Sequence, residues 1–115
     1  MDESVIDWGI YAELRDTTGA EFVAELVDTF IEEGPGMLAE LRAVRAEGDI
    51  ERFRRAVHSL KSNGRTFGAV KLTALAREFE VKGLDADSTR DVAGLAALEA
   101  EYARAAAELK ALRNG

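Results

Sequence analysis

Apolar residues recur every three or four positions along almost the whole chain, and no other feature constrains the fold as strongly. This spacing places apolar side chains on one face of an α-helix, whereas a β-strand needs alternation, which no stretch of useful length shows. Helix-favouring Ala, Leu, Glu and Arg are abundant, and the chain has one proline. The sequence therefore predicts an all-α protein.

Local signals predict where the first two helical segments begin. Asp7 is a capping residue ahead of a short helix that we expect to end near Arg15. Thr18 and Glu21 have the spacing of a capping box, which predicts the start of the second segment. Within that segment Pro35 either kinks the helix or begins a new one, since proline is tolerated in a first helical turn.

Glycines and capping residues delimit the other segments. Asp49 caps the third segment, Gly68 ends it, Gly83 ends the fourth, and a polar connector at 85–88 leads into the last helix. The apolar positions expected to face the core are Phe22, Val23, Leu26, Val27, Phe30, Ile31, Met37, Leu38, Leu41, Val44, Phe53, Ala56, Val57, Leu60, Gly64, Phe67, Val70, Leu72, Leu75, Ala76, Phe79, Leu95, Leu98, Tyr102, Ala105, Leu109 and Leu112.

Short connections between amphipathic helices favour antiparallel neighbours. We therefore predict one domain over residues 1–115, an antiparallel up-down four-helix bundle with a short N-terminal capping helix. The alanine-rich last helix could instead pair between chains as a coiled coil, although its apolar stripe requires no more than core packing. We expect a monomer.

Composition excludes several classes of function. The chain has no cysteine, which removes disulfides, thiolate metal sites and cysteine nucleophiles and fits a cytoplasmic location. No run approaches the roughly 18 apolar residues of a membrane span, and the formal charge of −7 argues against nucleic-acid binding. Because one compact domain begins at Met1, we expect a free-standing protein.

The single histidine, His58, falls outside the apolar face of the third segment. At about 100° per residue, His58 lies about 140° from Phe53 on a helical wheel, so its side chain is predicted to face solvent. Its neighbours at helical spacing are polar or basic: Arg54, Arg55, Lys61, Ser62 and Arg65. An inert surface histidine would fit the same position.

The charge distribution favours a functional histidine. The stretch from Arg52 to Arg77 holds seven basic residues and no acidic one, and the rest of the chain holds eight basic residues against 22 acidic ones. Such a basic patch attracts anions and acidic protein surfaces. A solvated basic helix face is the simpler explanation of the same pattern.

The residues around His58 suit phosphoryl chemistry. A neutral imidazole is a nucleophile, and Lys61 on the next turn could offset the charge of phosphoryl oxygens. The sequence has no nucleotide-binding glycine loop, no kinase signature, no acidic cluster at metal spacing and no second general acid or base near the histidine. We expect a phosphoryl carrier without a metal or cofactor of its own, which relies on partners for catalysis.

Several stretches resemble the histidine-containing phosphotransfer (HPt) family. The family pattern is a histidine, two residues, a lysine and usually a glycine, then a Leu-Gly-Ala-like corner and a leucine-rich helix. It corresponds here to His58–Ser62, Phe67–Ala69 and Leu75–Glu80, with further similarity at Phe22–Leu26 and Gly48–Asp49. The resemblance covers roughly residues 8 to 112.

The resemblance implies a four-helix bundle whose histidine exchanges phosphate with aspartates of response-regulator receiver domains, downstream of a hybrid sensor histidine kinase. The receiver would supply the aspartyl phosphate and the magnesium. His58 would be the phospho-acceptor and Lys61 would help to hold the phosphoryl group. We expect Arg54, Arg55, Ser62 and Arg65 to contact the partner. Ser62 departs from the usual glycine, which leaves room for the receiver. Because serine is small and polar and its hydroxyl can donate a hydrogen bond to phosphate, we expect retained function, with a changed rate or partner preference as the alternative.

Two other functions stay open at this point. A docking module or kinase inhibitor would bind a partner through the same helical face without transferring phosphate, but it would not require the pair of His58 and Lys61. A self-contained enzyme has little support because no cofactor signature accompanies the histidine.

Overall fold

The structure, a computed structural model, describes residues 5–83 and 88–114. These residues form five helices and no strand, which confirms the prediction of an all-α protein. The helices are α1 (Trp8–Thr18), α2 (Ala20–Glu47), α3 (Ile50–Phe67), α4 (Val70–Lys82) and α5 (Ser88–Asn114).

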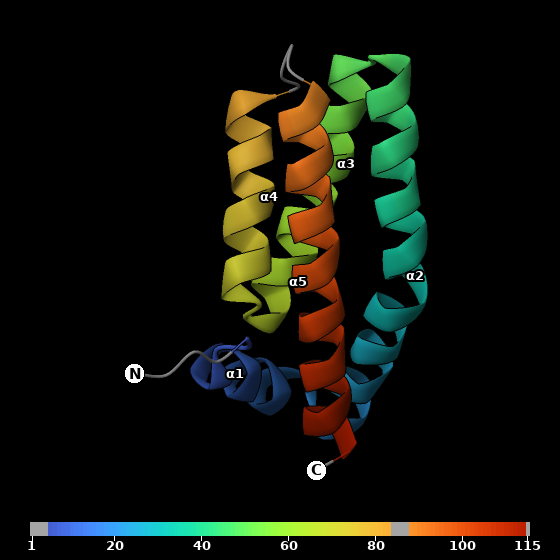
Figure 1. Cartoon of the computed structure of the whole chain (residues 1–115). Coiled ribbons are helices and arrows are strands. Elements are labelled where there is room, and N and C mark those ends of the chain that lie inside the picture. Colours follow the sequence, from blue (N-terminus) through green and yellow to red (C-terminus); the bar gives the residue numbers. More distant parts are fainter. Residues whose placement is uncertain (1–4, 84–87, 115) are drawn as a thin grey trace.

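Helices α2 to α5 stand side by side along the long axis of the molecule, and α1 lies across one end (Figure 1). Helix α3 packs against α2 and α4, and α5 closes the ring by packing against the same two helices, while α1 contacts α2 and α3. The space between them is filled by fully buried side chains such as Leu41, Phe53, Leu60, Leu72, Leu95 and Leu98.

Most of the predicted core positions are buried, and two are clearly not. Phe22 and Val70 are 50% and 51% exposed, against the sequence prediction. Each lies in the first turn of its helix, where fewer neighbouring helices are in reach to cover a side chain. Helical periodicity identifies the inward face but not how far the packing extends along it.

The junction between α1 and α2 differs from the prediction. The Asp7 cap is confirmed, since its carboxylate accepts a hydrogen bond from the Ile10 N–H at 3.2 Å. Helix α1, however, continues beyond Arg15 to Thr18. The Thr18 hydroxyl donates to the Leu14 carbonyl (2.8 Å), so the predicted capping box is wrong, and Gly19 with φ +98° precedes α2 instead.

Helix α2 runs through Pro35 without a break, and Figure 1 shows it changing direction part-way along its length. Pro35 has no N–H to donate to the Ile31 carbonyl. The Tyr102 hydroxyl of α5 donates to the Phe30 carbonyl at 2.7 Å and lies 3.2 Å from the Ile31 carbonyl oxygen. Gly34 leaves room for this ring, because a Cβ there would lie 1.9 Å from the Tyr102 oxygen.

Helices α3 and α4 approach closely, which matters because both carry the candidate site. The Asp49 cap is confirmed by a 3.1 Å hydrogen bond from the Arg52 N–H, and Gly68 with φ +79° ends α3. A Cβ at Gly64 would lie 2.8 Å from the Thr73 hydroxyl of α4, so glycine permits the contact. Of the predicted connector at 85–88, residues 85–87 lie outside the described residues, and Ser88 belongs to α5.

Candidate functional site

His58 projects into solvent from the middle of α3, as its place on the helical wheel predicted. Its side chain is 58% exposed. Val57 and Leu60, its neighbours on the opposite face, are fully buried. The core contacts therefore fix the helix while the imidazole stays accessible.

Glu80 of α4 joins His58 and Lys61 in one cluster. One carboxylate oxygen lies 2.5 Å from His58 Nδ1, and the other lies 2.5 Å from Lys61 Nζ. The Lys61 and Glu80 side chains are largely covered, at 14% and 22% exposed, whereas the imidazole is open. Lys61 is thus brought to the histidine through the carboxylate rather than presented freely to solvent.

The Glu80 bridge determines which ring nitrogen of His58 carries a proton. The hydrogen bond from the Lys61 ammonium, together with that from His58, holds the pKa of the Glu80 carboxyl below its usual range. An ionised carboxylate is an acceptor only, so Nδ1 of His58 must carry the proton that it donates to Glu80. In the neutral ring the lone pair is then on Nε2, the other ring nitrogen.

Glu80 corrects one prediction from the sequence. No second acid or base was expected near the histidine, yet Glu80 contacts it directly. The two residues are 22 positions apart on different helices, so periodicity within one helix carries no signal of the contact. The one available hint was that Glu80 ends the stretch Leu75–Glu80, which resembles the HPt pattern.

The four residues expected to contact a partner lie on α3 but do not form one cluster. Arg54 and Arg55 line an open depression together with His58 and Glu80. Arg65 lies in a neighbouring groove that it shares with Lys61. Ser62 is exposed and lines neither depression.

The three arginines of this set present their charge to solvent. Among the described residues, no ion pair involves Arg54, Arg55 or Arg65. Their positive charge is therefore available to an incoming anionic group or acidic surface.

The described part of the chain holds neither a group of metal ligands nor a helix that could span a membrane. No group of three or more His, Asp or Glu side chains there is placed to hold a metal ion. Nor does any helix of residues 5–83 and 88–114 combine the length and apolar character needed to cross a membrane.

The model of the Hpt domain family matches residues 25–113, which include His58, Lys61 and Glu80. The chain belongs to the Hpt family. This Hpt domain is similar to the crystal structure of histidine-containing phosphotransfer protein B (HptB) from Pseudomonas aeruginosa PAO1. The two chains share 26% identity with a TM-score of 0.81, and the similarity covers 98% of this chain and 97% of that one. No curated protein matches with significance.

Membership of the Hpt family establishes the general role of the chain. It is a histidine phosphotransfer carrier of a phosphorelay in two-component signalling, as its resemblance to the family implied.

Proposed function

We propose that His58 is the phospho-acceptor of this Hpt domain and that Lys61 stabilises the phosphoryl group. The observation that carries the proposal is the bridge from Glu80 to His58 Nδ1 on an imidazole that is 58% exposed. This bridge leaves Nε2 as the nucleophilic atom on the solvent side. A docking module without phosphotransfer would not need a nucleophilic atom there.

The transfer step uses the lone pair of Nε2. This nitrogen attacks the phosphorus of a receiver's aspartyl phosphate, and the P–N bond forms as the P–O bond to the aspartate breaks. The aspartate leaves as a carboxylate with the electron pair. Nδ1 keeps its proton, and Glu80 offsets the positive charge of the substituted ring while Lys61 contributes positive charge beside the phosphoryl oxygens. Donation to a second receiver is the reverse of this step.

The architecture, partners and location that we propose for the chain are those expected of an Hpt family member. Helices α2 to α5 form an antiparallel up-down four-helix bundle, with α1 as its cap, that acts as a carrier without autonomous catalysis. Its partners are receiver domains and a hybrid sensor histidine kinase, which it meets as a monomer in the cytoplasm. Arg54 and Arg55 line the depression that holds His58, Ser62 lies one turn further along α3, and Arg65 lines the neighbouring groove; the exposed arginines suit an acidic partner.

The acceptor is tested with the His58→Gln variant. A panel of receiver domains is used, and each is phosphorylated on its aspartate with labelled acetyl phosphate. Each receiver is then mixed with the wild-type chain or with the variant. We expect acid-labile label on the wild type and none on His58→Gln, with the free energy of unfolding changed by no more than about 0.5 kcal/mol because the site is exposed.

Lys110→Gln, an exposed change on α5, is the matched control and should accept label normally. Label that persists on His58→Gln would place the acceptor elsewhere. Stable binding of a receiver without label on the wild type would favour the docking function.

A further inference from the structure

A groove with apolar and charged walls runs between α3 and α4 and includes Lys61 of the His58 cluster. Its charged lining residues are the basic Lys61, Arg65, Arg77 and Lys82 and the acidic Glu78, and its largest aliphatic ones are Val70 and Val81. A smaller depression lined by Arg65, Val70 and Thr73 continues it to Ile10 of α1. The groove therefore follows one side of α4 from α1 towards the candidate site.

The groove exposes aliphatic side chains that the core does not use. Val81 is 74% exposed, Val70 is 51% exposed and Ile10 is 42% exposed. Single exposed apolar residues are ordinary on a protein surface, but several along one groove indicate a surface that a partner covers.

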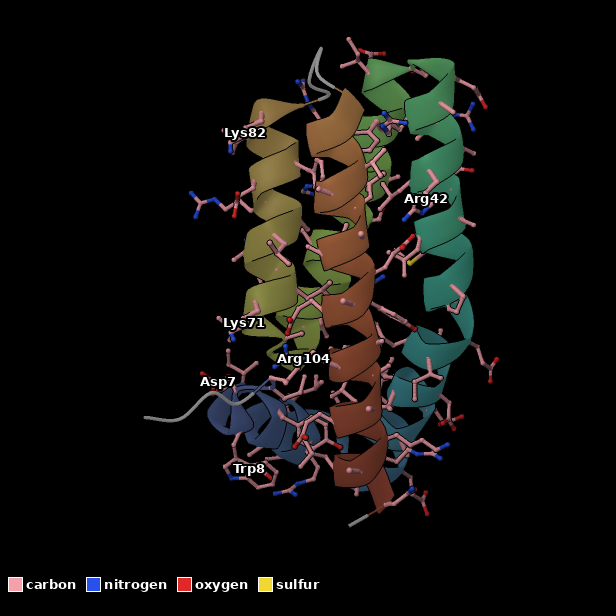
Figure 2. The ribbon with its side chains drawn as sticks, in the orientation of Figure 1. Asp7, Trp8, Arg42, Lys71, Lys82 and Arg104 are labelled. Carbon is pink, nitrogen blue, oxygen red and sulfur yellow. The ribbon has the colours of Figure 1, made fainter. Side chains whose placement is uncertain are left out.

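The rim of the groove is positively charged although the chain carries −7 overall. Arg65 and Arg77 form no ion pair with any described residue. Lys82 lies 3.9 Å from Glu78, a distance that leaves both side chains largely hydrated. Figure 2 shows Lys82 near the upper end of α4, directed away from α5.

The surface between α3 and α2, which shares Arg55 and Ser59 with the depression around His58, has a different character. A depression there is lined by Glu40, Arg52, Arg55, Ala56 and Ser59, with no large aliphatic side chain. Arg52 is neutralised by Glu40 at 2.9 Å and by Glu47 at 3.1 Å. The α4 side and the α2 side of α3 thus offer a partner unequal surfaces.

We propose that the receiver that exchanges phosphate with His58 docks along α4, with aliphatic residues on Val81 and Val70 and carboxylates facing Arg65 and Arg77. The groove is continuous with the site, because Lys61 belongs to both and Glu80 precedes Val81 in α4. This docking mode rests on the proposed function. The partner is therefore an acidic protein surface with an apolar centre, seated on the α4 side of the imidazole.

The test uses the receiver that transfers phosphate to the wild-type chain fastest. Arg65→Glu/Arg77→Glu should lower kcat/KM for transfer about tenfold at low salt, and the loss should shrink as salt screens the charges. Val81→Gln should lower it at least about threefold at every salt concentration. The matched controls on α5, Val92→Gln and Lys110→Glu, should transfer at the wild-type rate.

A small phosphodonor separates the two proposals. Phosphoramidate needs no docking, so the groove variants should accept label from it as the wild type does. Normal transfer from the receiver to both groove variants would overturn the docking mode and leave the acceptor intact. Failure of the wild type to accept label from any donor would overturn the proposed function itself.

The oligomeric state tests whether a second copy of this chain, rather than a receiver, occupies the groove. Sedimentation should show a monomer for the wild type and for the variants. A dimer that Arg65→Glu/Arg77→Glu dissociates would mean that a second, acidic copy of this chain occupies the groove, and the docking mode would be wrong.

Discussion

Glu80 connects the chemistry of His58 to a neighbouring helix. Its carboxylate contacts both Nδ1 of the imidazole and the Lys61 ammonium, so one side chain orients the ring and holds the lysine. Partners of this kind fix the ring and its tautomer, and their loss typically reduces the activity of a histidine 10- to 100-fold in metal sites. The proposed acceptor thus depends on a residue that never touches the phosphate.

Glu80→Gln tests this dependence. The amide oxygen still accepts a hydrogen bond from Nδ1, but the charge that balances the substituted ring is lost, so phosphate transfer should slow about tenfold. The rate of label transfer from a receiver measures the effect. Unchanged transfer would mean that Glu80 is only a structural partner of Lys61.

The same variant has a pH signature. Because the Lys61 ammonium and then His58 lower the pKa of Glu80 in the folded chain, its ionised form stabilises the fold. That contribution is complete above the unfolded glutamate pKa of about 4.3 and is lost as the pH falls through the lower folded value. Urea unfolding should show wild type more stable than Glu80→Gln at pH 7, with the difference shrinking towards pH 3. A difference that is constant with pH would contradict this.

The two key residues differ in how far the sequence revealed them. His58 was identifiable because it lies outside the strong apolar stripe of its own helix. Glu80 was not, because its contact depends on how α3 and α4 are aligned. Local periodicity is enough to predict that the side chain of His58 is exposed. Predicting its bridge to Glu80 requires the tertiary structure.

At the scale of elements, α2 and α5 are held in one register by a contact between Gly34 and Tyr102. The Tyr102 hydroxyl donates to the Phe30 carbonyl and lies near the Ile31 carbonyl, one turn before Pro35, and the space for its ring exists because residue 34 has no Cβ. Two charge contacts add to this pairing, Arg42 with Glu99 and Arg113 with Asp28. The sequence left kink and break undecided at Pro35 because the compensating donor comes from another helix, 72 positions from the Phe30 carbonyl.

Two glycines on either side of Pro35 should respond oppositely to alanine. Gly34→Ala places a methyl group against Tyr102 and should cost about 1 to 3 kcal/mol of unfolding free energy. Gly36→Ala meets nothing within 4 Å and should add about 0.5 to 1 kcal/mol, because alanine favours helix. Chemical denaturation followed by circular dichroism measures both. Equal effects would rule out the close contact.

At the scale of the whole molecule, α1 is fastened where α3 turns into α4. The Asp7 N–H donates to the Gly68 carbonyl at 2.7 Å, and Ile10 packs beside that glycine. Trp8 lies on the side of α1 that faces away from α4 (Figure 2). Its ring stacks on that of Tyr11. The order of the helices followed from the sequence, but the exposure of Phe22 and Val70 did not, because it depends on where the helix ends meet their neighbours.

Gly68→Ala should loosen this attachment. Alanine at φ +79° costs about 1 to 2 kcal/mol, and its Cβ would also lie 3.0 Å from the Asp7 carbonyl oxygen and from Ile10 Cβ. Gly48→Ala is the matched control, since it has a similar φ of +74° and open space around it. Urea unfolding should show the larger loss for Gly68→Ala, with faster proteolysis within α1. Equal losses would mean that α1 contributes nothing at this corner.

The bridge between His58 and Glu80 also makes signalling competence a property of tertiary order. A molten globule keeps much of its helix but loses fixed packing between helices. In such a state His58 would remain on its helix, separated from the carboxylate that sets its tautomer. A freshly synthesised or heat-loosened chain would therefore transfer phosphate more slowly before its helices melt. The carrier would reach its full transfer rate only once α3 and α4 have packed together.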